Sequence, residues 1–225
     1  RSRGLGDVYK RQHFACLLQW DNIYYQEPTE EYISPKTTVR VGLVQWQMRS
    51  YKTLDDLFEQ VEFFVDSVSG YQSDFVLFPE YFNAPLMARF NDASESQAIR
   101  GLARYTDEIR ERFINLAIRY NINIITGSMP LIKEDGLLYN VGFLCRRDGT
   151  YEMYEKLHVT PDEMKCWGLS GGKAIRTFET DCAKIGVLIC YDVEFPELSR
   201  IMASEGMQIL FVPFLTDTQN AYSRV

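Results

Sequence analysis

The 225-residue chain has little of what a disulfide framework or a metal centre needs. It contains only two histidines, His13 and His158, too few for a histidine-rich metal site, and no Cys-x-x-Cys pair. Its cysteines are odd in number and have no paired spacing, which argues against a disulfide framework. The five are Cys16, Cys145, Cys166, Cys182 and Cys190. We therefore expect a reducing, cytoplasmic compartment and neither a metal nor an organic cofactor.

The sequence also lacks a basic excess and a long apolar run. Lys and Arg number 24 against 31 Asp and Glu, for a formal net charge of −7. A nucleic acid or an anionic membrane would favour a basic face, so neither is expected as a partner. No run approaches the roughly 20 apolar residues that a membrane span needs. The N-terminal residues also lack the hydrophobic core of a signal peptide, which again favours a cytoplasmic protein.

Three segments of different character follow one another along the chain. Residues 1–12 are basic and aperiodic and contain no initiator Met, so they resemble an adaptor-derived, non-native segment; a genuine basic tail is the alternative. Residues 13–38 are first apolar and aromatic, then polar with prolines, which favours a linker or the tail of an upstream domain. An N-terminal extension packed on the main domain is the alternative. Residues 39–225 have the periodicity of one folded domain.

Within this last segment, apolar residues follow helical and strand periods. Leu54–Val68 and Thr106–Tyr120 place apolar side chains three and four positions apart, which predicts amphipathic helices, and a third helix is expected at 195–205. Short apolar or alternating runs predict strands at 38–45, 74–78, 121–128, 137–147, 150–156, 174–179, 183–190 and 208–212. Helices and strands alternate, then hairpins appear, then alternation returns. This order predicts an α/β layered sandwich of mixed sheets with helices on the outer faces.

Three of the expected strands end in a reactive or charged side chain: Glu80, Lys156 and Cys190. A thiol at a strand-to-helix corner can attack carbon, a carboxylate can take and return its proton, and a fixed ammonium can face an oxyanion. Each residue alone has an ordinary explanation, because a cysteine after an apolar run usually lies in the core. Together they predict attack on an amide-like carbon through sulfur. His158 follows Lys156 by two positions, so on a strand it would share the face of the lysine, in a structural role.

Three segments carry a resemblance to a known family. Phe78–Phe82 (Phe-Pro-Glu-Tyr-Phe), Tyr154–His158 (Tyr-Glu-Lys-Leu-His) and the run Ile-Cys-Tyr-Asp-Val-Glu-Phe-Pro-Glu from Ile189 resemble, in order and rough spacing, the signature segments of the nitrilase superfamily of carbon–nitrogen hydrolases. The resemblance runs from about Val39 to Val225. It implies a four-layer α-β-β-α sandwich. Domains of this family usually run several tens of residues further, so the sandwich is expected to be incomplete at the C-terminus.

The resemblance also implies roles for individual residues. Glu80 would be the general base, Lys156 the cation that stabilises the oxyanion, and Cys190 the nucleophile. The backbone N–H of Tyr191 would share the oxyanion with the lysine. Many members carry a second glutamate in the loop after the lysine, for which Glu163 is the candidate and Asp162 the competitor.

The expected activity is hydrolysis of a linear amide or an N-carbamoyl amine through a thioester on Cys190, with a small-molecule amide as substrate. A soluble N-acyltransferase that uses the same thioester and a non-catalytic scaffold of the same fold are the alternatives, and a nitrile substrate stays open. The resemblance further implies a homodimer or a larger homo-oligomer, paired across the helix expected at 195–205. An acyltransferase-like domain upstream of this segment is also possible, since some members of the family carry one.

Overall fold

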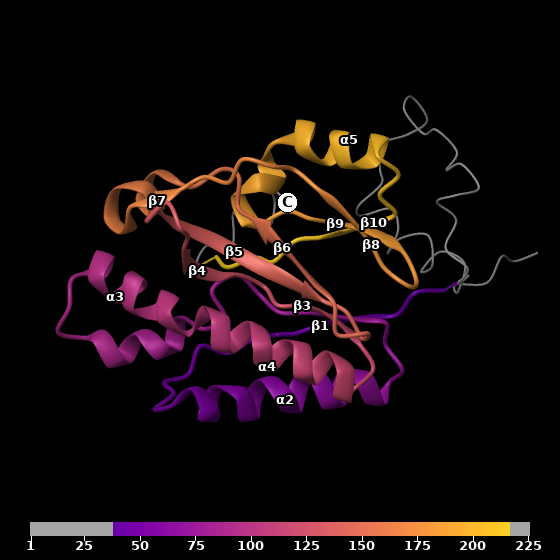
Figure 1. Ribbon diagram of the computed structural model, residues 1–225, viewed down its shortest axis with the longest axis horizontal. Coiled ribbons are helices and arrows are strands. Elements are labelled where there is room, and N and C mark those ends of the chain that lie inside the picture. The colour runs from indigo at the N-terminus through magenta and orange to yellow at the C-terminus, as the bar shows by residue number, and fades with distance from the viewer. Residues whose placement is uncertain (1–37, 217–225) are drawn as a thin grey trace, which may run out of the picture. The chain divides into compact units, whose positions relative to one another are not determined.

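A seven-stranded and a three-stranded sheet form the centre of the computed structural model, which describes residues 38–216 (Figure 1). The predicted segment 1–12, and the predicted linker 13–38 except for its last residue, lie outside the described residues. Contacts divide the chain after Ile33, and every described residue belongs to the second unit, Ser34–Val225.

The larger sheet has the order β1-β2-β3-β5-β4, with β6 and β7 also paired to β5. Its first three strands are parallel, whereas β5 runs antiparallel to β3, β4 and β6 and parallel to β7. In the register of the parallel strands, Phe75 lies beside both Val41 and Asn123. The strands are β1 (Val41–Leu43), β2 (Phe75–Leu77), β3 (Asn123–Ile125), β4 (Met129–Ile132), β5 (Leu138–Cys145), β6 (Tyr151–Glu155) and β7 (Leu169–Ser170).

The smaller sheet has the order β10-β9-β8, with β8 antiparallel and β10 parallel to β9. Its strands are β8 (Thr177–Glu179), β9 (Lys184–Val187) and β10 (Ile209–Phe211). The longer helices are α2 (Leu54–Gly70), α3 (Glu95–Leu102), α4 (Thr106–Arg119) and α5 (Pro196–Ser204). Shorter helical segments are η2 (Ala84–Phe90), η3 (Ala103–Tyr105), η4 (Glu163–Trp167, a π-helix) and η5 (Cys190–Glu194).

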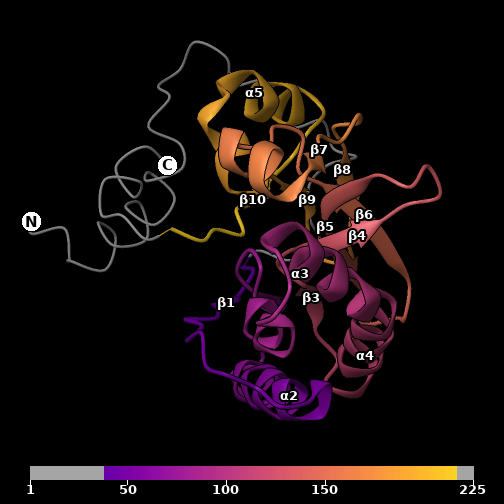
Figure 2. The ribbon, with the colours of Figure 1, turned by 90° about the vertical axis from the view of Figure 1, so that its left-hand side faces the viewer.

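Two apolar cores and the packing of α5 on the smaller sheet arrange these elements in four layers. One face of the larger sheet packs on α2 and α4, through residues such as Val61, Phe113 and Ile124. Its other face packs on the smaller sheet, where Leu144 and Ile185 belong to one buried cluster. The outer face of the smaller sheet is covered by α5, so the order is α-β-β-α, as Figure 2 shows with α5 at one end and α2 and α4 at the other. The predicted sandwich is therefore confirmed.

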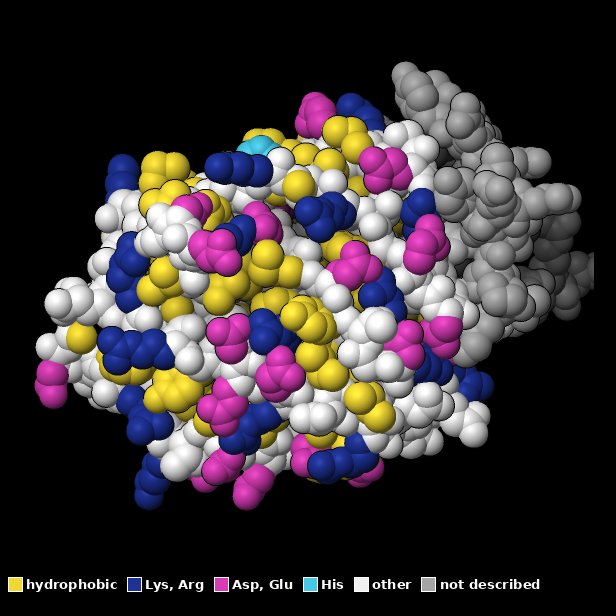
Figure 3. All heavy atoms as spheres, viewed as in Figure 1, with side chains coloured by type: hydrophobic (Ala, Val, Ile, Leu, Met, Phe, Trp, Pro, Cys, Tyr) yellow, Lys and Arg dark blue, Asp and Glu magenta, His cyan; other side chains and the backbone are white. Residues whose placement is uncertain are grey.

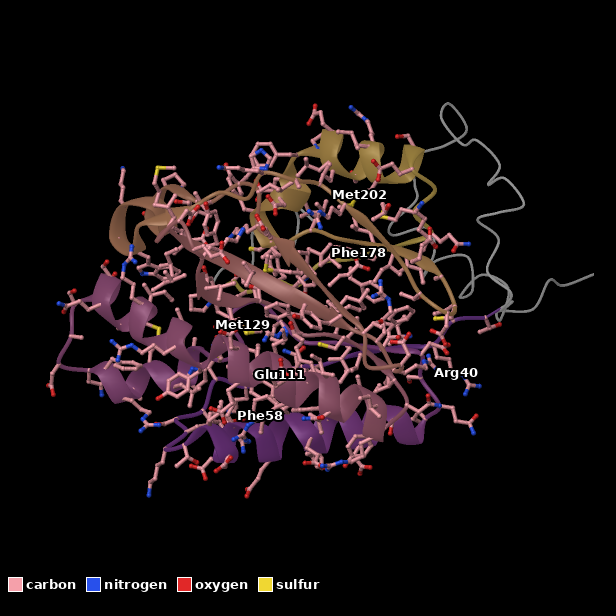
Figure 4. All side chains as sticks on the ribbon, in the orientation of Figure 1. Arg40, Phe58, Glu111, Met129, Phe178 and Met202 are labelled. Carbon is pink, nitrogen blue, oxygen red and sulfur yellow. The ribbon has the colours of Figure 1, made fainter. Side chains whose placement is uncertain are left out.

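A glycine lies where α5 and the chain after it approach the smaller sheet. A Cβ built on Gly186 of β9 would lie 2.3 Å from Sδ of Met207 and 2.6 Å from Sδ of Met202, so both methionine side chains would have to move. Met202 of α5 is only 1% exposed, and Figure 4 labels it together with Phe178 of β8. The glycine thus lets the helix rest on the strand that leads to Cys190.

The predicted helices 54–68, 106–120 and 195–205 correspond to α2, α4 and α5. Thr53 caps the start of α2: its Oγ1 accepts from the N–H of Asp56 while the Asp56 carboxylate accepts from the N–H of Thr53, a capping box. The sequence analysis missed α3, β4 and β7. Ser94 and Gln97 form the same kind of capping box before α3, which is the signal that could have revealed it.

The surface and the helices add two observations. On the face seen in Figure 3, Lys and Arg side chains alternate with Asp and Glu, so this face has no continuous basic stripe. Among residues 38–216, none of the helices is both long and apolar enough to cross a membrane.

Candidate functional site

The side chains of Glu80, Lys156 and Cys190 meet where strands of both sheets end. Glu80 follows β2 and forms an isolated parallel bridge with Ser128, while Lys156 directly follows β6; both belong to the larger sheet. Cys190 follows β9 of the smaller sheet and opens η5. Lys156 Nζ lies 2.8 Å from Glu80 Oε1, and the negative charge of the same carboxylate acts on the Cys190 thiol, whose Sγ donates to the carbonyl of Leu215 at 3.8 Å. The structure therefore brings together the three residues that the sequence analysis singled out.

The backbone at the site adopts conformations that side chains rarely accept. Cys190 has φ +48° and Tyr81, directly after Glu80, has φ +50°. For residues other than glycine, the left-handed region costs roughly 1–2 kcal/mol, and such strain often occurs at active sites. The N–H of Cys190 donates to the carbonyl of Pro213 at 2.9 Å, which ties the strained turn to the chain after β10. The thiol is thereby presented on a sharp corner between strand and helix.

A second glutamate completes the charged cluster, and it is Glu163, not the exposed Asp162. Glu163 is 5% exposed, and its Oε1 accepts from Lys156 Nζ at 2.8 Å and from the Tyr81 hydroxyl at 3.0 Å. Its Oε2 accepts from the backbone N–H of Thr160 at 2.7 Å. The π-helical turn η4 turns Glu163 inward, so the lysine lies between two carboxylates.

This arrangement keeps Lys156 charged. Burial, which leaves the side chain 2% exposed, lowers the pKa of the lysine, but the attraction of Glu80 and Glu163 and their hydrogen bonds outweigh it and raise the pKa above its ordinary value. A permanently charged ammonium in surroundings of low polarity is suited to stabilising an oxyanion.

The pKa values of the Cys190 thiol and of the neighbouring Glu80 carboxylate are both raised. Burial, together with the negative charge of Glu80, raises the pKa of Cys190 to about 12. Burial also raises the pKa of Glu80, although Lys156 opposes the shift. At neutral pH the sulfur therefore carries its proton, and a thiolate can form only if a neighbouring base accepts that proton as the sulfur attacks.

Sequence reasoning missed Asp192, which joins the two loops that carry Lys156 and Cys190. Its carboxylate, 0% exposed, accepts from the backbone N–H groups of Leu157 at 3.0 Å and His158 at 2.7 Å. Those two residues directly follow the lysine, whereas Asp192 lies in the turn opened by the cysteine. One carboxylate thus fixes the position of one loop against the other. The sequence signal that could have revealed Asp192 is an acidic residue two positions after Cys190.

The predicted location of His158 is wrong. The chain leaves β6 at Glu155, so His158 does not continue the strand and does not share the buried face of Lys156. Its side chain is 39% exposed, contacts Asp192 Oδ1 through Nδ1 at 3.1 Å, and stacks on Phe195 with ring centroids 3.8 Å apart. These contacts fit the structural role that the sequence analysis expected.

Tyr191 lies in the first turn of η5, where backbone N–H groups have no partner within the helix. Its ring meets Phe195 edge-on, with centroids 5.2 Å apart. The location beside Cys190 is compatible with the expected oxyanion contact, and that role stays a prediction.

Replacing Asp192 by alanine is expected to lower the free energy of unfolding by about 2–3 kcal/mol, because two backbone N–H groups lose a charged acceptor. Urea unfolding of the full-length protein measures the loss. The matched control is Asp148→Ala, since Asp148 also accepts two bonds, from the N–H and hydroxyl of Thr150, but on an exposed turn. A loss for Asp192→Ala no larger than that of the control would contradict the inferred clamp.

Comparisons with known proteins bear on the family of the chain. A family model described as "Carbon-nitrogen hydrolase" matches residues 40–224. Probable hydrolase YhcX of Bacillus subtilis is 43% identical over 213 residues, which cover 94% of this chain and 41% of that protein. Human omega-amidase NIT2 is 32% identical over 188 residues, which cover 79% of this chain and 63% of that protein. The chain therefore spans less than two thirds of these relatives' length.

Solved structures of similar fold share little sequence with this chain. Nit3 of Saccharomyces cerevisiae, a member of branch 10 of the nitrilase superfamily, has a TM-score of 0.71 at 22% identity, covering 87% of this chain and 70% of that one. A mutant amidase from Nesterenkonia in complex with acrylamide has a TM-score of 0.68 at 20% identity, covering 84% and 70%. At such identities the likeness shows the fold.

The match to the Bacillus protein also bears on the segment before Val39. Residues from Val39 onward make up about five-sixths of the chain. A match over 94% of the chain therefore extends into the preceding residues. Whether those residues form a linker or the tail of an upstream domain stays a prediction.

Proposed function

Because the chain belongs to the carbon–nitrogen hydrolase family, we propose that it hydrolyses small linear amides or N-carbamoyl amines through a thioester on Cys190. One observation carries the proposal: a carboxylate, an ammonium and a thiol from three strand ends lie close enough to shift one another's pKa, and the carboxylate and the ammonium are hydrogen-bonded. Both charged groups are nearly inaccessible, with 3% of Glu80 and 2% of Lys156 exposed. A buried ion pair is weak evidence for stability, so its presence beside a thiol favours a chemical role.

In the acylation step, Glu80 accepts the thiol proton as the sulfur of Cys190 bonds to the substrate carbonyl carbon. The carbonyl electron pair moves to oxygen, and Lys156, with the N–H of Tyr191, stabilises that negative charge. The carbon–nitrogen bond then breaks as the electron pair returns. The leaving nitrogen takes the proton from Glu80 and departs as ammonia or an amine, which leaves a thioester and an ionised Glu80.

In the deacylation step, Glu80 accepts a proton from water as the water oxygen attacks the thioester carbon. The carbon–sulfur bond breaks, the thiolate regains a proton from Glu80, and the acid is released. Glu163 takes no proton in either step. Its two hydrogen-bonded oxygens hold Lys156 against the oxyanion.

The names of the relatives favour an amide as the substrate. The human protein and several vertebrate relatives at 29–32% identity are omega-amidases, which supports a linear amide over an N-carbamoyl amine. A relative from Schizosaccharomyces pombe, 36% identical over 48% of this chain, is a probable nitrilase, so a nitrile belongs among the compounds to test.

Intact-mass spectrometry of the full-length protein, mixed with a small library of amides, N-carbamoyl amines and nitriles, tests the proposal. We expect an acyl adduct on Cys190 with at least one amide, and one ammonia released for each acid formed. Ammonia measured with and without added amines separates two activities, because an acyltransferase forms a new amide and speeds up when an amine is present. No adduct and no ammonia with any compound would leave the non-catalytic scaffold as the correct description.

A further inference from the structure

Asn140 is an amide inside a strand that is buried along its whole length. Every residue of β5 is buried, and Asn140 is 0% exposed. Its side chain lies on the strand face that carries Leu144 toward the smaller sheet, because residues at even spacing share a face. Burying an amide costs free energy unless its polar atoms find partners. The position therefore calls for a specific reason.

Two hydrogen bonds join Asn140 to two different members of the charged cluster. Its Nδ2 donates to Glu80 Oε1 at 3.0 Å, the oxygen that Lys156 Nζ also contacts. Its backbone carbonyl accepts from the N–H of Lys156 at 2.9 Å. One residue of β5 thus contacts the carboxylate through its side chain and the lysine through its main chain.

The other atom of the amide shows that stability alone does not explain the residue. Asn140 Oδ1 is buried and has no hydrogen-bond partner among the described residues. Turning the amide over would not help, because Oδ1 would then face a carboxylate oxygen, and neither atom can donate. An apolar side chain of similar size would leave no polar atom unpaired in this strand. The hydrogen bond to Glu80 is therefore the reason we infer for an asparagine at this position.

We propose that Asn140 is a positioning residue for Glu80: its amide N–H fixes Oε1, so that Oε2 faces the thiol of Cys190 and takes its proton. The inference deepens the proposed function and rests on it. Oε1 already accepts from Lys156 and Asn140, so two donors define the plane of the carboxylate. With only the lysine as donor, the carboxylate could rotate about that single contact.

The groups that surround Glu80 determine how its titration should respond. The titratable side chains facing it are Lys156 after β6, Glu163 of η4, Cys190 of η5 and Tyr81 beside it. A hydrogen bond donated to a carboxylate stabilises its charged form and lowers its pKa, so loss of the Asn140 donor raises the pKa of Glu80. The Glu80 carboxylate and the Cys190 thiol titrate as a coupled pair. Without the Asn140 donor, the first of their two protons is therefore lost at a higher pH.

The test compares Asn140→Leu with wild type in the full-length protein. Iodoacetamide labelling of Cys190, followed by peptide mass spectrometry across pH, gives the midpoint of the rise in reactivity without any substrate. We expect that midpoint to move up by about one pH unit. The exposed thiol of Cys166 in the same digest is the internal reference and should not change. With an amide substrate, kcat should fall about 10- to 100-fold while KM changes less than about threefold.

Two further variants keep the proposal open to contradiction. Asn140→Ala also removes the donor and serves if the leucine variant does not fold. Asn123→Leu removes a buried amide, 1% exposed, at the other end of the sheet, where it donates to Asp181 at 2.9 Å. It should lower stability and leave the labelling midpoint in place. An unmoved midpoint in both Asn140 variants, or an equal shift in Asn123→Leu, overturns the positioning role.

The labelling result is independent of the proposed function. If wild type hydrolyses none of the compounds, the proposed activity fails while the midpoint still decides whether Asn140 governs Glu80. If amides are hydrolysed and the midpoint does not move, the activity stands and only the role of Asn140 fails.

Discussion

Replacing Cys190 by alanine is expected to lower turnover by roughly 10⁴-fold or more and to leave the protein folded. In the proposed mechanism the residue supplies the atom that bonds to the substrate, so no remaining group can take its place. The reaction left over would be attack by water, assisted by Glu80 and Lys156. Ammonia release and the absence of an acyl adduct in the intact mass measure the loss.

The fold should tolerate this change, since alanine meets the same cost at φ +48° as cysteine does. The thiol is only partly buried, so its removal should shift the free energy of unfolding by no more than about 1 kcal/mol. The matched control is Cys166→Ala, which removes an exposed thiol from η4 and should keep full activity. Activity within tenfold of wild type in Cys190→Ala would end the assignment of the nucleophile.

Replacing Lys156 by methionine is expected to have the largest effect on stability. The side chain is 2% exposed and lies 2.8 Å from both Glu80 and Glu163, so its loss leaves two buried carboxylates facing each other. Removing one partner of a buried ion pair typically costs about 3–5 kcal/mol. Turnover should also fall by roughly 10²–10³-fold or more, because an oxyanion donor is lost. Urea unfolding and ammonia release measure the two losses.

A double variant separates the structural from the chemical part of that loss. Adding Glu163→Gln to Lys156→Met removes one unpaired charge, so it should recover part of the stability and none of the turnover. The control is Lys133→Met, which breaks a partly exposed ion pair with Glu155, the residue directly before Lys156. This variant should lower the free energy of unfolding by less than about 1 kcal/mol. Recovery of turnover in the double variant would contradict the role given to Lys156.

The parts of the fold that sequence reasoning could predict are those with long, regular periods. The helices α2 and α4 and the hairpin of β5 and β6 were expected within a few residues. The eight-residue helix α3 and the five-residue π-helix η4 were not, because such short segments carry too little periodicity to be recognised. The choice between Asp162 and Glu163 depended on η4, which buries Glu163 beside Lys156 and leaves Asp162 exposed, while the catalytic role of Glu163 stays a prediction.

The residues of the candidate site also fall into those that the sequence could predict and those that it could not. Glu80, Lys156 and Cys190 each end a strand, and strand ends can be located from the apolar runs. Asn140 and Asp192 act through partners far away in the sequence, on Glu80 and on the N–H groups of Leu157 and His158. Such contacts depend on strand order and register, which local patterns do not specify.

The division of the site between two sheets has a consequence for synthesis. Glu80 and Lys156 belong to the sheet that is translated first, whereas the sulfur arrives with the strands that follow β7. A nascent chain that has emerged only as far as β7 contains Glu80 and Lys156 but not Cys190. With the roles proposed above, such a chain has a base and a cation but no nucleophile, so we expect reactivity only after the strands that follow β7 have been translated and docked.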